Sequence, residues 1–169
     1  METPRLLLRP MQATDLEDLL RIFSDPKVMA AFNSTPFDPQ QMAQWLQRNL
    51  DHQTRHGYGL FSVILKANEE LIGDCGLALM VVDGAEVAEL GYDFRSEYWN
   101  QGYATEAAIA VRDFAFHVLG LPELISLIRV GNRASRRVAE KIGMVFLSEF
   151  EGNGRRYWKY GIERAVRLK

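Results

Sequence analysis

The chain has 169 residues, of which 47% are hydrophobic and 25% are charged, and its formal net charge is −2. These values are typical of a soluble globular protein and predict one domain over residues 1–169, long enough to bury a substantial core. A net charge so close to zero excludes a broad basic surface for nucleic acid and a polybasic membrane patch.

Targeting and metal-binding signals are missing from the sequence. No apolar run reaches the length of a membrane span, and the first segment, METPRLLLRPM, is too short and too charged for a signal peptide. The single cysteine, Cys75, excludes an internal disulfide and suits a reducing compartment. No Cys/His cluster has the spacing of zinc ligands. We therefore expect a cytoplasmic protein without a metal site.

The first elements predicted are a strand at Thr3–Arg9 and a helix after it. Thr14 and Glu17 have the spacing of a capping box, which predicts the start of this helix. Asp25-Pro26 is predicted to end it, because proline cannot continue a helix. Its apolar face consists of Leu16, Leu19, Leu20 and Phe23.

Asp38 marks the start of a second helix. Pro39 suits the first helical position and Gln41 completes a capping box, while Gly57 is typical of a helix C-terminus. The apolar positions of this helix are Met42, Trp45, Leu46 and Leu50.

The remaining predicted elements alternate between hairpins and helices. Three strands come first, at Tyr58–Lys66, Leu71–Val82 and Glu86–Phe94, with turns at Ala67–Glu70 and Asp83-Gly84. They are followed by a helix that ends near Leu119, a strand at Glu123–Val130, a short helix at Ala134–Ile142 ended by Gly143, and a hairpin of Val145–Phe150 with Arg156–Arg164.

The segment Tyr98–Ala108, YWNQGYATEAA, joins the fourth predicted strand to the third predicted helix. The first N–H groups of a helix have no partner inside it, and glycine lets a ligand approach the backbone closely. Such a loop is suited to holding phosphate, with successive N–H groups of Gln101, Gly102, Tyr103, Ala104 and Thr105 aimed at one anion. Taken alone, the pattern fits equally a tight turn with Thr105 near a helix start. It is not a Walker loop, because the chain contains no GxxxxGK[ST].

This segment resembles the acyl-CoA-binding loop of the GNAT acetyltransferase superfamily, whose general form is (Q/R)xxGx(G/A). Gly102 and Ala104 match the last two positions, whereas Trp99 stands where the general form has Gln or Arg. The run YW-x-x-GYATEA is similar to one branch in particular, the RimJ/RimL-like ribosomal-protein N-terminal acetyltransferases.

The predicted order, β-α-α-β-β-β-α-β-α-β-β, agrees with this superfamily along the whole chain. The resemblance implies an α+β fold, in which a central, mostly antiparallel seven-stranded sheet carries helices on both faces. It also implies that strands 4 and 5 run parallel and splay apart to open a cleft for the cofactor.

The resemblance further implies that acetyl-CoA is the cosubstrate. The loop residues 101–105 are then expected to bind the phosphates, and the backbone of Phe94 and Arg95 the pantetheine arm. Asn132 matches an asparagine that usually contacts pantetheine. For Arg133, Arg136 and Arg137, the alternatives are a CoA phosphate contact and ordinary surface charge.

Glu89 and Asp93 lie on one face of the fourth predicted strand, roughly 13 Å apart along it. A carboxylate on this strand often serves as general base in the superfamily, which by resemblance assigns that role to Glu89. Asp93 fits a solvated face equally well. Gly91, between them, is suited to a bulge or a close backbone approach.

Ser135 stands at the position that some members of this branch use as general acid toward the leaving thiolate. The alternative is structural, because NxxS before a helix is also a capping arrangement. Many relatives use a tyrosine one turn further on, where this chain has Ala139. A thiol has a pKa near ~8.5, so the thiolate leaves without much help from an acid. Cys75 has no histidine near it in sequence and is interpreted as a packed thiol.

The sequence therefore predicts an acetyl-CoA-dependent N-acetyltransferase in which the amine attacks the thioester directly. By branch resemblance the acceptor is the α-amine of a protein or peptide N-terminus, possible partners including ribosomal proteins. The alternatives are a small-molecule amine (polyamine, amino acid or antibiotic) and a CoA-binding module without catalysis. Phe32, Trp45 and Tyr58 fit either the core or an acceptor pocket, and the chain is equally compatible with a monomer and a homodimer.

Overall fold

The computed structural model describes residues 1–82 and 84–165, which include a seven-stranded sheet of order β1-β2-β3-β4-β5-β7-β6. All neighbouring strands are antiparallel except β4 and β5, which run parallel. The strands are β1 (Leu6–Pro10), β2 (Leu60–Leu65), β3 (Glu70–Val82), β4 (Ala85–Phe94), β5 (Glu123–Arg129), β6 (Val145–Gly152) and β7 (Arg155–Glu163). The predicted turn between β3 and β4 includes Asp83, which lies outside the described residues.

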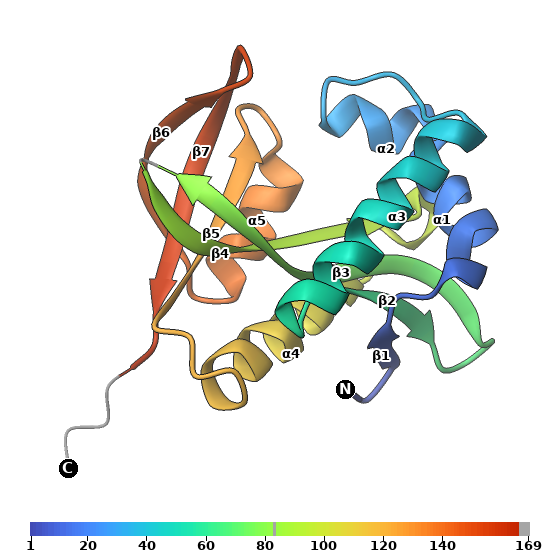
Figure 1. Cartoon of the computed structure of the whole chain (residues 1–169), viewed down its shortest axis with the longest axis horizontal. Helices are drawn as coiled ribbons and strands as arrows, with labels where there is room; N and C mark the ends of the chain where they lie inside the picture. Colours follow the sequence, from blue (N-terminus) through green and yellow to red (C-terminus); the bar gives the residue numbers. More distant parts are fainter. Residues whose placement is uncertain (83, 166–169) are drawn as a thin grey trace.

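Helices cover both faces of the sheet, as Figure 1 shows, and a separate buried cluster lies on each face. On one face α1 (Leu16–Phe23), α2 (Pro26–Ala31) and α3 (Pro39–His56) pack over the β1–β4 half. On the other face α4 (Tyr103–His117) and α5 (Arg133–Lys141) bury small side chains against the strands, among them Ala107, Ala108 and Ala139. Small residues let these helices lie close to the sheet.

The start of α1 differs from the prediction. The chain first forms a 3-10 turn at Ala13–Asp15, and the Gln12 N–H donates to the Asp15 carboxylate at 2.8 Å. Asp15 also binds the Arg9 guanidinium and the Ser62 hydroxyl. These tertiary contacts hold Asp15 at the helix start, so Thr14 does not act as the cap that its spacing with Glu17 predicts.

As predicted, α1 ends just before Asp25-Pro26, but a short helix that the sequence analysis did not predict, α2, begins there. Asp25 is the N-cap, and its carboxylate accepts the Lys27 N–H at 2.8 Å. Pro26 occupies the first turn, where its missing N–H costs nothing. The α3 caps are as predicted: Asp38 and Gln41 form a capping box, and Gly57 ends the helix with φ = 72°.

The parallel pair β4–β5 has a single residue pair in register within the described ranges, Glu89 with Ile125. Toward the C-terminal end of β4 the two strands separate, which confirms the expected splay. Figure 1 shows α1–α3 at one end of the molecule and the β6–β7 hairpin at the other, so this opening lies near the middle of the sheet.

Candidate active site

A cavity of about 270 Å³ lies at the splay between β4 and β5. Phe32 at the end of α2 and Trp45 of α3 form an apolar wall. Glu89 and Asp93 of β4 and Ser135 of α5 also line the cavity. The cavity therefore connects the α1–α3 face with the α4–α5 face of the sheet. Tyr58, the third aromatic residue in question, packs instead beside His52 and His56.

Glu89 lies at the point where β4 leaves β5. The Leu127 N–H of β5 donates to its Oε1 at 3.3 Å. Removal of the carboxylate from bulk water raises the pKa of Glu89 to about 7, and the Leu127 hydrogen bond lowers it only in part. A carboxylate with a pKa near neutral is a far better proton acceptor than an ordinary glutamate.

On the other side of β4, Ser135 and Tyr92 form a hydrogen-bonded pair. The Ser135 hydroxyl donates to the Tyr92 oxygen at 3.1 Å, and the Tyr92 hydroxyl donates to the Ser135 carbonyl at 2.7 Å. Burial raises the pKa of Tyr92. The cap of α5 is Asn132, whose side chain accepts the Ser135 N–H at 3.0 Å. The NxxS capping arrangement is therefore present, with Asn132 as the cap, and the Ser135 hydroxyl takes no part in it.

Two aspartates lie deeper on the Glu89 face. Asp93 lies directly opposite Asp74 of β3 in the strand register, and both residues line the cavity. Burial raises the pKa of Asp93, and the charge of Glu89 raises it further. Burial also raises the pKa of Asp74, with a further contribution from Asp93. The sequence contained Asp74, but no local pattern linked it to Asp93, since the pairing is between two different strands.

The N-terminus of α4 has the backbone that an anion site needs. Gly102 is the N-cap with φ = 85°, a conformation that favours glycine, and the first intrahelical bond runs from the Glu106 N–H to the Gly102 carbonyl. The N–H groups of Tyr103, Ala104 and Thr105 therefore precede the intrahelical ladder, at the positive end of the helix dipole. The Gln101 side chain turns away from this end and donates to the Glu97 carbonyl at 3.0 Å.

Contacts from the N-terminal segment support this loop, and sequence reasoning missed them. Arg5 donates to the Gln101 carbonyl at 2.9 Å and to the Glu106 carboxylate at 2.7 Å, and its guanidinium lies 4.3 Å from the centre of the Tyr103 ring. Thr3 donates to the same carboxylate at 2.6 Å. Although burial opposes ionisation, these hydrogen bonds lower the pKa of Glu106. No sequence window could join residues about a hundred positions apart.

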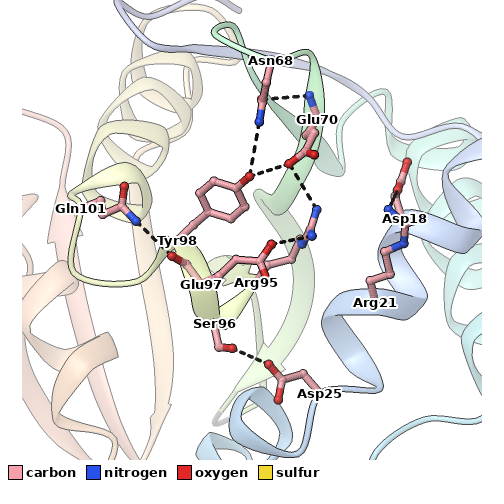
Figure 2. Close-up of polar contacts among 10 residues, drawn as sticks. All are labelled: Asp18, Arg21, Asp25, Asn68, Glu70, Arg95, Ser96, Glu97, Tyr98 and Gln101. Carbon is pink, nitrogen blue, oxygen red and sulfur yellow. Dashed lines mark hydrogen bonds and ion pairs between the residues drawn. The ribbon is translucent and has the colours of Figure 1, made fainter.

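The connection between β4 and α4 is tied to two other elements (Figure 2). Ser96 donates to Asp25, the cap of α2, at 2.5 Å. Tyr98 donates to Glu70 at the start of β3, also at 2.5 Å, and Arg95 lies 3.6 Å from the same carboxylate. The segment before α4 is therefore held in place on both sides.

Phe94 and Arg95 differ in where their backbone groups point. The Arg95 N–H donates to the Ile72 carbonyl of β3, and the Arg95 carbonyl accepts from Tyr98. The backbone N–H and C=O groups of successive residues in a strand point to opposite sides. The backbone groups of Phe94 therefore point toward β5, on the side where β4 and β5 separate. The Trp99 indole donates to the Phe94 carbonyl at 2.8 Å across this opening. Trp99 thus closes the loop where the general motif has Gln or Arg.

The remaining residues in question lie outside the cavity. Arg136 is paired with Glu140 at 2.8 Å, and Arg133 and Arg137 are exposed on the same helix. Cys75 is fully buried in the core, and burial raises the pKa of its thiol. In residues 1–82 and 84–165, no helix is long and apolar enough to cross a membrane.

Residues 5–145 match the family described as acetyltransferase (GNAT) domain. The chain belongs to this family. It is 36% identical over 143 residues to the uncharacterised protein YkkB of Bacillus subtilis, covering 84% of this chain and 83% of that protein. It is 32% identical over 141 residues to an uncharacterised N-acetyltransferase, p20, of Bacillus licheniformis, covering 83% and 79%. Among solved structures, an acetyltransferase from Agrobacterium tumefaciens superimposes with a TM-score of 0.82 at 28% identity over 96% of this chain and 93% of that one.

The protein is therefore a GNAT N-acetyltransferase with the α+β fold of that family. GNAT enzymes use acetyl-CoA, and the structure fits this cosubstrate. The Phe94 backbone faces the opening beside β5, and the α4 N-terminus with Gly102 lies at the end of the same segment.

Proposed function

We propose that this GNAT enzyme transfers the acetyl group of acetyl-CoA to a primary amine by direct attack, with Glu89 as the general base. The observation that carries the proposal is the position of Glu89. Its carboxylate lines the cavity at the point where β4 leaves β5, and it shares that cavity with Ser135 and Tyr92 on the other face. Glu89 then lies on one side of the reacting carbonyl as the base, and the Ser135–Tyr92 pair lies on the other side, next to the leaving thiolate.

The cosubstrate is held along the splay in this proposal. The phosphates bind at the N–H groups of Gly102, Tyr103, Ala104 and Thr105, and the pantetheine arm lies along the Phe94 backbone. Gln101, Arg95 and Asn132 act mainly as positioning residues, because their side chains or backbone groups already bind within the protein.

The chemical step balances as follows. The amine nitrogen forms a bond to the acetyl carbon, the bond from that carbon to sulfur breaks, and the ammonium proton passes to Glu89, directly or through water. CoA leaves as a thiolate, whose conjugate acid has a pKa near ~8.5 and which needs little protonation at neutral pH. The Ser135–Tyr92 pair lies on the side where that thiolate departs.

Two acceptor classes follow from different observations. The YW-x-x-GYATEA run favours the RimJ/RimL-like branch and hence the α-amine of a protein N-terminus, which is partly neutral at cellular pH. The carboxylate-lined cavity favours a small cationic amine. A ribosomal-protein-S5-alanine acetyltransferase from Vibrio fischeri and a spermidine N-acetyltransferase from Vibrio cholerae, 17% and 20% identical, both share the fold, with TM-scores of 0.76 and 0.75.

The substitution Glu89→Gln tests the proposal. It removes the base and keeps an oxygen for the Leu127 N–H, so kcat is expected to fall by roughly 10²-fold or more. In the wild type, kcat is expected to decline as pH falls through about 7, because Glu89 must be ionised to accept a proton. This decline is expected to be absent from the residual activity of the variant.

Glu86→Gln is the matched control, because Glu86 lies exposed on the same strand. Calorimetry with acetyl-CoA is expected to give the same affinity for wild type and both variants. Near-wild-type turnover of Glu89→Gln at neutral pH would remove Glu89 from the mechanism.

A further inference from the structure

Asp74 is a buried carboxylate without a partner. Its relative accessibility is 0%, and neither carboxylate oxygen accepts a hydrogen bond from any residue that the structure describes. Buried polar groups in proteins are nearly always hydrogen-bonded, because an unmade bond costs the full desolvation of the group. Asp74 lines the cavity, so a ligand in that cavity can supply the missing donors.

The groups around Asp74 raise the free energy of its ionised form. Asp93 is its direct cross-strand partner, and like charges at such positions repel. Ser62 is its partner on β2, but the Ser62 hydroxyl donates to Asp15, which is already paired with Arg9. The described residues lining the cavity include no lysine, arginine or histidine. Among the described residues, therefore, no side chain that lines the cavity neutralises the two aspartates.

Between this pair and Glu89, the space beside β4 is open. Gly76 and Gly91 form the register pair that separates Asp74–Asp93 from Glu89. A Cβ added at Gly91 would have only the Glu89 carboxylate oxygens within 4 Å, the nearer at 3.5 Å. Gly91 thus leaves a passage along β4, with roughly 13 Å of strand between Glu89 and Asp93. The position beside Gly76 is filled by the backbone of Gly59 and Leu60. Phe32 and Trp45 wall this passage with apolar surface.

We propose that Asp74 and Asp93 form a second ammonium-binding subsite, and that the acceptor is a small diamine or polyamine with a hydrocarbon linker. One ammonium group has three donors, enough for oxygens of both aspartates. The other amino group lies at Glu89, and the linker packs along Phe32 and Trp45. The inference rests on the proposed function, since it names the substrate of the same cavity. A divalent metal ion is a poorer occupant, because the described Asp, Glu, His and Cys residues include no group of three suited to hold one.

The test compares diaminobutane, diaminohexane and diaminooctane with butylamine, hexylamine and octylamine as acceptors. For the wild type, at least one diamine is expected to exceed the monoamine of equal length in kcat/KM by ~10-fold or more, the effect of about 1.4 kcal/mol of binding. In the double variant Asp74→Asn/Asp93→Asn this ratio is expected to fall close to one. Glu86→Gln is expected to keep the wild-type ratio.

A second measurement does not depend on turnover. Without acetyl-CoA, the preferred diamine is expected to raise the melting temperature of the wild type but not that of the double variant. An equal rise with magnesium or calcium chloride would identify the pair as a metal site and overturn the proposal. The same holds if a peptide with a plain N-terminus is acetylated faster than every diamine.

The two proposals fail in different ways. If acetyl-CoA binds but no amine of any class is acetylated, the proposed function is wrong. If monoamines and diamines of equal length are acetylated equally well by the wild type, the second subsite is wrong and the proposed function stands.

Discussion

Asn132 and Ser135, three residues apart, have different tasks in the structure. The Asn132 side chain caps α5 by accepting the Ser135 N–H. The Ser135 hydroxyl is left to bind Tyr92, a phenol that comes from β4 rather than from α5. A tyrosine hydroxyl thus lies beside the proposed path of the leaving group even though Ala139 occupies the position where many relatives have tyrosine.

Paired alanine substitutions separate these tasks. Asn132→Ala is expected to lower stability by on the order of 1 kcal/mol, because it removes a helix cap. Ser135→Ala is expected to leave the melting temperature nearly unchanged and to lower kcat by less than ~10-fold, since the thiolate needs little help. Thermal melts and steady-state kinetics on both variants check this. Equal destabilisation by the two substitutions would show that Ser135 is structural.

At the scale of elements, the α4 N-terminus is the part on which cosubstrate binding depends. Its conformation requires glycine at position 102, where φ is 85°. Its position is held by Arg5 and Glu106 on one side and by the segment that follows β4 on the other. Contacts within the protein therefore hold the loop in this conformation.

Gly102→Asp tests the role of this element. The substitution adds a negative charge and a Cβ at the proposed phosphate site, so calorimetry is expected to show acetyl-CoA affinity reduced by at least ten-fold, about 1.4 kcal/mol. Gly154→Asp is a matched control, because Gly154 has φ = 68° in the β6–β7 turn and nothing within 4 Å of an added Cβ. Both substitutions place a non-glycine residue at a positive φ. Equal affinities in the two folded variants would contradict the assignment of the phosphate site.

At the scale of the whole molecule, the cavity carboxylates lower the stability of the free enzyme. Burial raises the pKa of Glu89 to about 7, and burial also raises that of Asp93. A carboxyl group with a raised pKa in the folded state contributes most stability at low pH. That contribution is lost as pH rises from the unfolded value near ~4 through the folded value.

Asp93→Asn is therefore expected to stabilise the free enzyme at neutral pH. The neutral amide ends the repulsion with Asp74 and is cheaper to bury than a carboxylate. We expect a rise in melting temperature of at least ~2 °C, the shift that about 1 kcal/mol produces in a protein of this size. The difference from wild type should vanish below about pH 4, where both aspartates are protonated in either state. A gain that persists unchanged at low pH would point to packing as its cause, and Glu86→Gln provides the surface control.

Much of the fold follows from local signals in the sequence. Alternating and 3.6-residue apolar periods predicted the strands and helices, the Asp38–Gln41 capping box predicted the start of α3, and Gly57 its end. The run at Tyr98–Ala108 indicated the GNAT family, and through it the splay of β4 and β5. These signals work because each is encoded within a short window, where backbone geometry and the side-chain period act directly. At Asp25-Pro26 the local signal predicted the end of α1, and the start of α2 at the same two residues was missed.

Tertiary structure alone decided which side chains meet. Strand register placed Asp74 opposite Asp93 and left Gly76 and Gly91 between them and Glu89. The fold brought Arg5 of the N-terminal segment to Glu106 of α4, and Tyr92 of β4 to Ser135 of α5. The physical reason is the same in each case: these contacts join segments far apart in the chain, and a shift of one residue in register would turn each carboxylate to the other face of the sheet. The identity of the family is thus a property of local sequence, whereas the charge of the acceptor cavity is a property of the pairing between strands.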